Sequence, residues 1–164
     1  MPERPYDRDA AVRYARRWAL RRNPEYASFD NIGGDCTNFA SQCVFSGAGV
    51  MNFTPDVGWF YQSFRQRSAP WSGVTYLYQF LTNNHGPGPY GRNLPLFMAS
   101  PGDILQLNLD GKRFEHSLVV VDVGDPPSPD TITVVAHSND TDGKKLSEYD
   151  YQAFRLIHID GVKS

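Results

Sequence analysis

A pair of glycines followed by an acidic residue and a cysteine, Gly33-Gly34-Asp35-Cys36, constrains this chain more than any other segment. Two glycines allow a sharp backbone turn, and Asp35 is suited to cap the free N–H groups of a helix. Apolar residues then recur at helical spacing, at Cys36, Phe39, Ala40, Cys43 and Val44. The segment therefore predicts a buried helix whose first turn carries a thiol.

The position of Cys36 favours reactivity, because a helix N-terminus carries about half a positive charge and unpaired amide donors. Both features stabilise a thiolate relative to a thiol. The charge of Asp35 opposes them, so activation of Cys36 needs a nearby cation such as a protonated histidine. Cys36 is thus a candidate nucleophile, whereas Cys43 is predicted to be part of the core. The two sulfurs are expected to be free thiols, because they lie about 10 Å apart along the helix.

The length and composition of the chain limit its domain number, its partners and its location. With 164 residues and 40% hydrophobic content, the chain is expected to fold as one domain, and we expect a monomer. The net charge is −2 and the basic residues are scattered, so the sequence predicts no basic patch that would bind nucleic acid. No apolar leader and no run of about 18 apolar residues is present, so the sequence predicts neither a signal peptide nor a membrane span. The chain as it stands is expected to be cytoplasmic, and secreted if an export signal has been trimmed.

Periodicity predicts helices in the first half of the chain and strands in the second. Helical spacing covers residues 7–22, the Cys36 segment and residues 71–84, separated by an irregular aromatic stretch with a short helical turn near Trp59. Residues 85–100 are predicted to form a surface loop. Alternation predicts strands at residues 103–109, 114–123, 131–137 and 154–160, the first two joined by a tight turn at Asp110-Gly111. This order indicates an α+β fold, with the helices against one face of an antiparallel sheet.

Two histidines on predicted strands, His116 and His137, could activate the Cys36 thiol. If the sheet face that carries His116 is the one covered by the Cys36 helix, His116 can take the thiol proton and hold the thiolate as an ion pair. His137, on the neighbouring strand, can then orient His116. The backbone N–H of Cys36, with a side chain from the segment Tyr26 to Asn31, would stabilise the oxyanion.

Other readings of these residues remain open. A buried cysteine is commonly an inert small hydrophobe, and Cys36, His116 and His137 also have suitable ligand types for zinc, although they lack the short paired spacings of structural zinc sites. His85 lies in a Gly/Pro-rich loop and is expected to be solvated. His158 alternates with isoleucines, which predicts a structural role.

The helix segment Gly34 to Gln42 reads Gly-Asp-Cys-Thr-Asn-Phe-Ala-Ser-Gln and resembles the bacterial putative amidase domain without a mismatch. The likeness extends over nearly the whole chain. It includes Tyr6-Asp7-Arg8, Pro101-Gly102-Asp103, His116-Ser117 and Ala136-His137-Ser138. That domain is similar to the NlpC-type and CHAP cysteine hydrolases, which have a papain-like α+β fold.

The resemblance implies that Cys36 is the nucleophile and His116 the general base. Its third polar group would be His137, with Asn139 and Asp140 as rivals on the same segment. NlpC-type relatives also place a tyrosine near the oxyanion, for which Tyr26 is the counterpart. Candidates for binding the oxyanion or the substrate are therefore Tyr26, Asn31, Asp35 and Trp59.

The expected activity is cysteine-dependent hydrolysis of amide bonds through a thioester, without a metal or an organic cofactor. The implied partner is a peptide or amide substrate, with peptidoglycan fragments as the class suggested by the relatives. A catalytically silent binding domain would instead have an unreactive Cys36 and still bind such fragments. An acyltransferase would form the same thioester and differ only in the acceptor, which product analysis with added amines would reveal.

Overall fold

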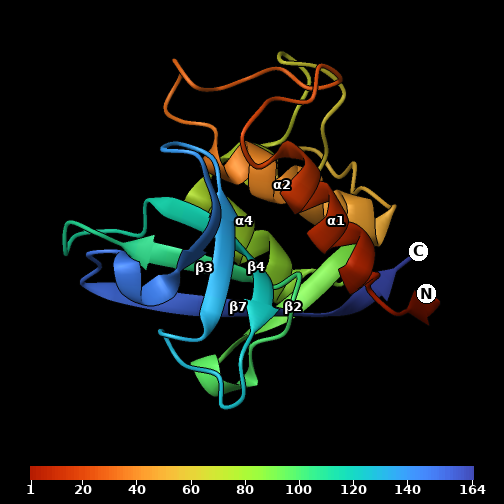
Figure 1. Cartoon of the computed structure of the whole chain (residues 1–164). Coiled ribbons are helices and arrows are strands. Elements are labelled where there is room, and N and C mark those ends of the chain that lie inside the picture. The colour runs from red at the N-terminus through yellow and green to blue at the C-terminus, as the bar shows by residue number, and fades with distance from the viewer.

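A seven-stranded antiparallel sheet forms the centre of the protein, which a computed structural model describes over residues 1–164 (Figure 1). The strands follow the order β1-β7-β3-β4-β5-β6, and β2 also pairs with β7. Their bounds are Glu3–Arg4 (β1), Gly88–Leu94 (β2), Ile104–Asn108 (β3), His116–Val123 (β4), Ile132–Ala136 (β5), Thr141–Lys145 (β6) and Ala153–Lys163 (β7). With four α-helices beside it, this sheet confirms the α+β prediction.

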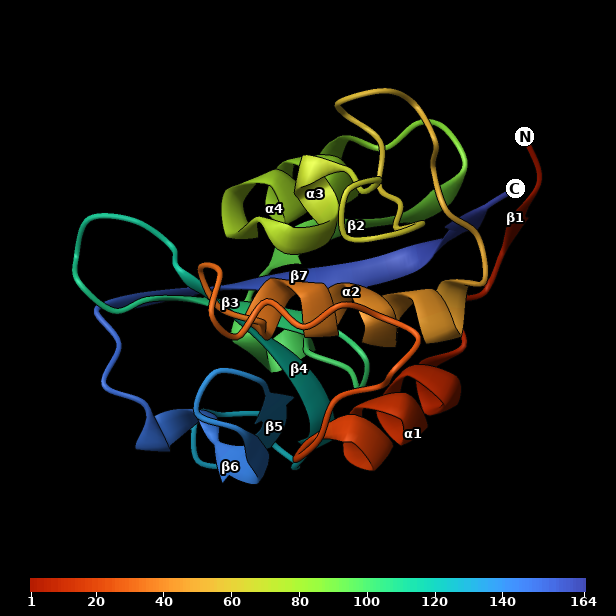
Figure 2. The ribbon, with the colours of Figure 1, turned by 90° about the horizontal axis from the view of Figure 1, so that it is seen from above.

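The α-helices gather on one face of the sheet, as expected. They are α1 (Arg8–Trp18), α2 (Cys36–Ala48), α3 (Ala69–Ser72) and α4 (Val74–Asn83). Figure 2 shows α2 between α1 and the α3–α4 pair. Apolar residues such as Phe39, Cys43 and Trp71 meet Ile104 and Val119 of the sheet in the larger of two cores. The opposite face of the sheet is also covered, so β3 and β4 are buried on both sides.

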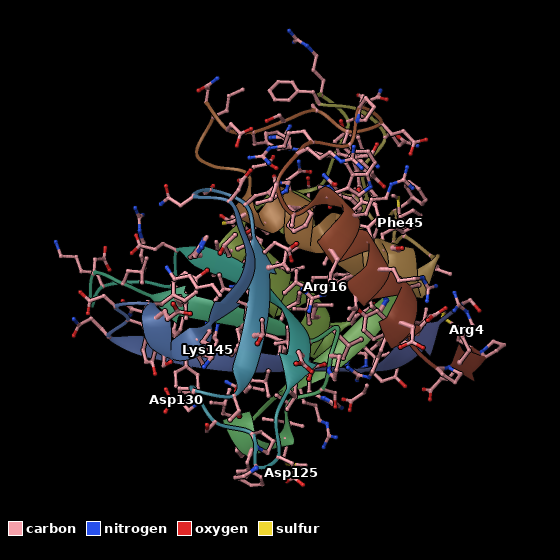
Figure 3. The ribbon with its side chains drawn as sticks, in the orientation of Figure 1. Arg4, Arg16, Phe45, Asp125, Asp130 and Lys145 are labelled. Carbon is pink, nitrogen blue, oxygen red and sulfur yellow. The ribbon has the colours of Figure 1, made fainter.

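The ends of α2 follow the predicted turn chemistry. Gly33 and Gly34 have φ angles of 84° and 100°, a region that glycine enters without steric cost. At the other end the helix stops at Gly49, which has a φ of 69° and donates its N–H to Phe45. Arg4, labelled in Figure 3, donates to the carbonyl of Ala48 and thus places a cation at the C-terminal end of the helix dipole.

Several element predictions were wrong. The expected loop 85–100 contains β2, and β6 was not predicted, because both strands have polar, Gly-containing sequences without clear alternation. The stretch 71–84 divides at Gly73 into α3 and α4, and no helical turn forms near Trp59, which pairs with Asn52 in an isolated bridge. The β3–β4 connection is also longer than a two-residue turn. No helix combines the length and the apolar character that a membrane crossing requires.

The close contact between α1 and α2 depends on Gly47. A Cβ there would lie 2.5 Å from the Asp7 carbonyl oxygen and 2.5 Å from Cε1 of Tyr6. We expect Gly47→Ala to destabilise the fold by about 1–3 kcal/mol and to lower Tm by roughly 2–12 °C, as measured by calorimetry. Ser46→Ala, an exposed neighbour on the same turn, is the control. Equal melting of the two variants would contradict the tight contact.

Candidate active site

Cys36 is the first residue of α2, as predicted, and is only 7% exposed. Its sulfur lies 3.7 Å from the Thr37 hydroxyl, and the backbone N–H donors of Ser117 and Thr37 act on its pKa. Burial raises the pKa of the thiol, while these donors and the Thr37 hydroxyl lower it to a smaller extent. The result is a buried thiol in a ring of donors that would stabilise negative charge on sulfur.

His116 is adjacent to Ser117 in β4, but its ring lies on the other side of the sheet from α2. The Ser117 hydroxyl reaches Thr37 of α2 at 2.9 Å, and successive strand residues point to opposite faces. His116 accordingly lies beside Tyr149, with ring centroids 6.1 Å apart, and makes no hydrogen bond to Cys36. The predicted direct approach of His116 to the thiol was therefore wrong for this conformation, because the helix covers the face of Ser117, Val119 and Val121.

The protonation states differ from the expected ion pair. Burial, reinforced by the positive charge of Lys144, lowers the pKa of His116 to about 4. Since burial also raises the pKa of Cys36, the favoured resting state near neutral pH is a neutral thiol beside a neutral imidazole. The imidazole keeps the capacity to accept a proton.

His137 is buried on the α2 face, stacked on Phe39 with ring centroids 3.7 Å apart. Its Nδ1 lies 2.6 Å from Oδ2 of Asp35 and its Nε2 lies 2.7 Å from the Trp18 carbonyl oxygen. Both ring nitrogens therefore have other partners, and the predicted contact with His116 does not occur. His137 and Asp35 therefore form a buried hydrogen-bonded pair.

Asp35 is a buried hub rather than a helix cap. Its Oδ1 accepts hydrogen bonds from the Phe29 amide at 2.8 Å and from Nδ2 of Asn38 at 2.9 Å, and its Oδ2 faces His137. Nε of Arg22 lies 3.5 Å from the same oxygen. The side chain makes no capping bond to α2 and is 1% exposed, so the prediction that it binds substrate was wrong.

The two other candidates for the third catalytic residue, Asn139 and Asp140, do not contact His116. Asp140 forms an exposed ion pair with Arg22 at 2.8 Å, and the exposed Asn139 sits in a turn with a φ of 64°. Neither has a hydrogen bond to His116. The zinc alternative is also not supported, because His116 and His137 lie on opposite sheet faces and no three candidate ligands converge.

The remaining predicted binding residues divide into two groups. Trp59 is fully buried and donates from Nε1 to Ser41 at 3.0 Å, so its predicted role at the substrate was wrong. Asn31 is exposed in the loop that precedes Cys36. Tyr26 is half-buried and stacks on Trp71, whose Nε1 donates to Asn38 of α2 at 2.9 Å. Burial raises the pKa of Tyr26 to about 12, so its phenol stays protonated and can donate a hydrogen bond.

Sequence reasoning missed a row of polar side chains that starts at the thiol. Ser117, Gln106 and Arg155 face one another across β4, β3 and β7. Gln106 donates to Ser117 at 3.3 Å and accepts from Nε of Arg155 at 2.8 Å. The available signal was the polarity of Gln106 and Ser117 within two otherwise apolar strands.

A sequence profile of the putative amidase domain family matches residues 5–159. The chain belongs to this family. The chain is also 34% identical over 128 residues to the uncharacterized protein YhbB of Bacillus subtilis, an alignment that covers 74% of this chain and 40% of YhbB. No solved structure shows a significant match.

A large hollow of this amidase-family chain is separate from Cys36. It has a volume of about 1200 Å³ and lies between the segment around Asn52–Val57 and α4. Asn52 follows the C-terminal end of α2, whereas Cys36 begins the helix. The chemistry of the thiol, rather than the size of this hollow, therefore locates the candidate active site.

Proposed function

We propose that this protein is a cysteine-dependent amidase in which Cys36 attacks the amide carbonyl and His116 is the general base. The observation that carries this proposal is the position of Cys36 at the start of α2, where the next residue, Thr37, is hydrogen-bonded to Ser117, the residue next to His116. Thiol and imidazole are thus attached to adjoining parts of the molecule in a member of an amidase family.

The proposed step that joins them is a movement of the chain at His116. His116 is the first residue of β4, and the register of β4 with β5 begins only at Val119 and Val135. Because the side chains of His116 and Ser117 point to opposite faces of the sheet, the ring would reach the sulfur only if the backbone at this strand end turned as well. Catalytic hydrogen bonds are often formed only in the substrate complex, so the unliganded separation is compatible with this role.

In the proposed reaction, His116 accepts the thiol proton while the sulfur forms a bond to the amide carbonyl carbon. The resulting imidazolium donates that proton to the leaving amine as the carbon–nitrogen bond breaks, which leaves a thioester. Water, deprotonated by His116, then attacks the thioester and releases the acid and the thiol. The Cys36 amide at the helix N-terminus and the Tyr26 hydroxyl are the proposed donors to the oxyanion.

The proposed substrate class is a peptide amide, including peptides of the cell wall. This class, and the assignment of the fold as papain-like, rest on the resemblance of the Gly34–Gln42 segment and its partners to NlpC-type and CHAP hydrolases. A catalytically silent binding domain is the second candidate. It is favoured by the raised pKa of Cys36 and by the lack of a resting contact to His116.

The pH dependence tests the role of His116. The imidazole must be neutral to accept a proton, and its pKa is lowered to about 4. We therefore expect kcat/KM, measured with a panel of N-acetyl-aminoacyl p-nitroanilides, to fall as pH drops through about 4 and to be flat from roughly pH 5 to 8. Lys144→Met should move this acid limb upward, because it removes one cause of the low pKa. Lys145→Met, an exposed neighbour, should leave it unchanged.

Two outcomes would contradict the proposal. An acid limb that persists in His116→Gln would remove His116 as the base. Absence of turnover for every substrate, together with wild-type binding of peptidoglycan fragments and no reaction of Cys36 with iodoacetamide near neutral pH, would favour the silent binding domain.

A further inference from the structure

Arg155 of β7 is a half-buried cation that has no carboxylate partner. Two of the other half-buried arginines are paired, Arg8 with Asp103 at 2.8 Å and Arg22 with Asp30 at 2.7 Å. Arg155 forms no ion pair, and its one hydrogen bond joins Nε to the neutral amide oxygen of Gln106. An unpaired, partly desolvated guanidinium is costly, so a bound anion would explain its retention.

The guanidinium is held firmly in one orientation. Its carbon lies 3.7 Å from the ring centroid of Tyr78 in α4 and 4.1 Å from that of Phe114 in the β3–β4 connection. Gln106 is itself fixed, because its Nε2 donates to the Val74 carbonyl oxygen at 2.9 Å. Such fixation reduces the entropy that a ligand would otherwise have to overcome.

One nitrogen at the end of the guanidinium is open to a ligand. Nη2 is buried without any hydrogen-bond partner. Nη1 also makes no hydrogen bond, but it is not among the buried atoms that lack a partner, so solvent can reach it. Nη1 therefore offers charged N–H donors to a carboxylate oxygen.

The location connects this cation to the thiol. Arg155, Gln106 and Ser117 are paired across three neighbouring strands. The Ser117 hydroxyl lies 2.9 Å from that of Thr37, which lies 3.7 Å from the Cys36 sulfur. Two strand spacings amount to about 10 Å, which is roughly the length of three residues of extended peptide.

We propose that Arg155 recognises a carboxylate of the substrate and selects amides that carry an acidic group about three residues from the bond that is cleaved. The proposal rests on the proposed amidase function for the position of that bond. Arg155 would be a specificity-determining residue that touches the substrate away from the reacting atoms.

Binding without turnover tests the proposal. In the Cys36→Ala variant, isothermal titration would compare N-acetyl-tetraalanine, which has a free carboxylate, with its C-terminal carboxamide. We expect the acid to bind roughly tenfold to hundredfold more tightly than the carboxamide. Added Arg155→Met should abolish the difference, and Arg155→Lys should retain part of it, because lysine keeps the charge but not the planar fork. Added Arg113→Met, an exposed arginine beside Phe114, should leave the difference unchanged.

Equal affinity for the acid and the carboxamide, absence of binding by both, or full discrimination in Arg155→Met would overturn the proposal. Circular dichroism and Arg155→Lys guard against an effect of misfolding. The amidase function is tested separately, by measuring turnover of amide substrates by the wild-type protein. If the protein discriminates the acid from the carboxamide but shows no turnover, Arg155 remains an anion site and the amidase function is rejected. If it shows turnover without discrimination, the amidase function stands and the role of Arg155 is rejected.

Discussion

Replacing Cys36 with alanine is expected to lower kcat/KM for amide hydrolysis by roughly 10⁴-fold or more, because the reaction loses the atom that becomes covalently bound to the acyl group. The thiol is 7% exposed at the start of α2, with donors from Ser117 and Thr37 around the sulfur. The measurement is p-nitroanilide release by wild-type and variant proteins at pH 7. A thioester that forms in the wild type should also be absent from the variant, as judged by mass spectrometry of the protein after rapid acid quenching.

Cys43→Ala is the matched control for this loss. Cys43 belongs to the same helix, is completely buried in the larger core and is also a free thiol. The variant loses a small apolar group and should keep its activity within about threefold at a temperature where it remains folded. If Cys36→Ala retained activity within tenfold of wild type, hydrolysis would have to proceed without this sulfur.

Asp35→Asn is expected to cause the largest loss of stability among single polar substitutions, about 3–5 kcal/mol. The side chain of Asp35 is hydrogen-bonded to the Phe29 amide, to Asn38 and to the His137 ring in a buried site. Asparagine keeps the shape but replaces one carboxylate oxygen with an NH₂ group, which would face a donor. For a chain of this length, Tm should fall by roughly 6–20 °C.

The control for Asp35 is Asp30→Asn. Asp30 also pairs with Arg22, at 2.7 Å, but its side chain is 39% exposed, so this change should cost less than about 1 kcal/mol. His137→Leu measured alone and with Asp35→Asn should give a double-mutant cycle with strong coupling. Independent, additive effects of the two substitutions would contradict the His137–Asp35 pair.

The local chemistry of α2 could be read from the sequence. Gly33 and Gly34 adopt the positive φ angles that their pairing predicted, and Gly49 ends the helix. The apolar spacing of Phe39, Cys43 and Val44 placed these residues in the core. Such features depend on neighbours within a few residues, so they are encoded locally.

The roles of the polar residues next to that helix could not be read in this way. Asp35 is at the capping position, yet its oxygens bind a loop amide and a histidine more than 100 residues away in the chain. Arg155 and Gln106 likewise meet only because β3 and β7 pair. Long-range partners of this kind depend on strand order, which alternation alone leaves open.

The sheet face on which His116 lies was decided by the tertiary structure and not by the sequence alone. The sequence alone predicted a strand over residues 114–123, which forms over His116–Val123, and a helix with Cys36 in its first turn. In β4, however, Leu118 and Val120 on one face and Val119 and Val121 on the other are all buried. Both faces therefore satisfy the hydrophobic pattern, and only packing against α2 decided that Ser117 faces the helix and His116 does not. A slip of one residue would exchange the two faces, because side chains alternate along a strand.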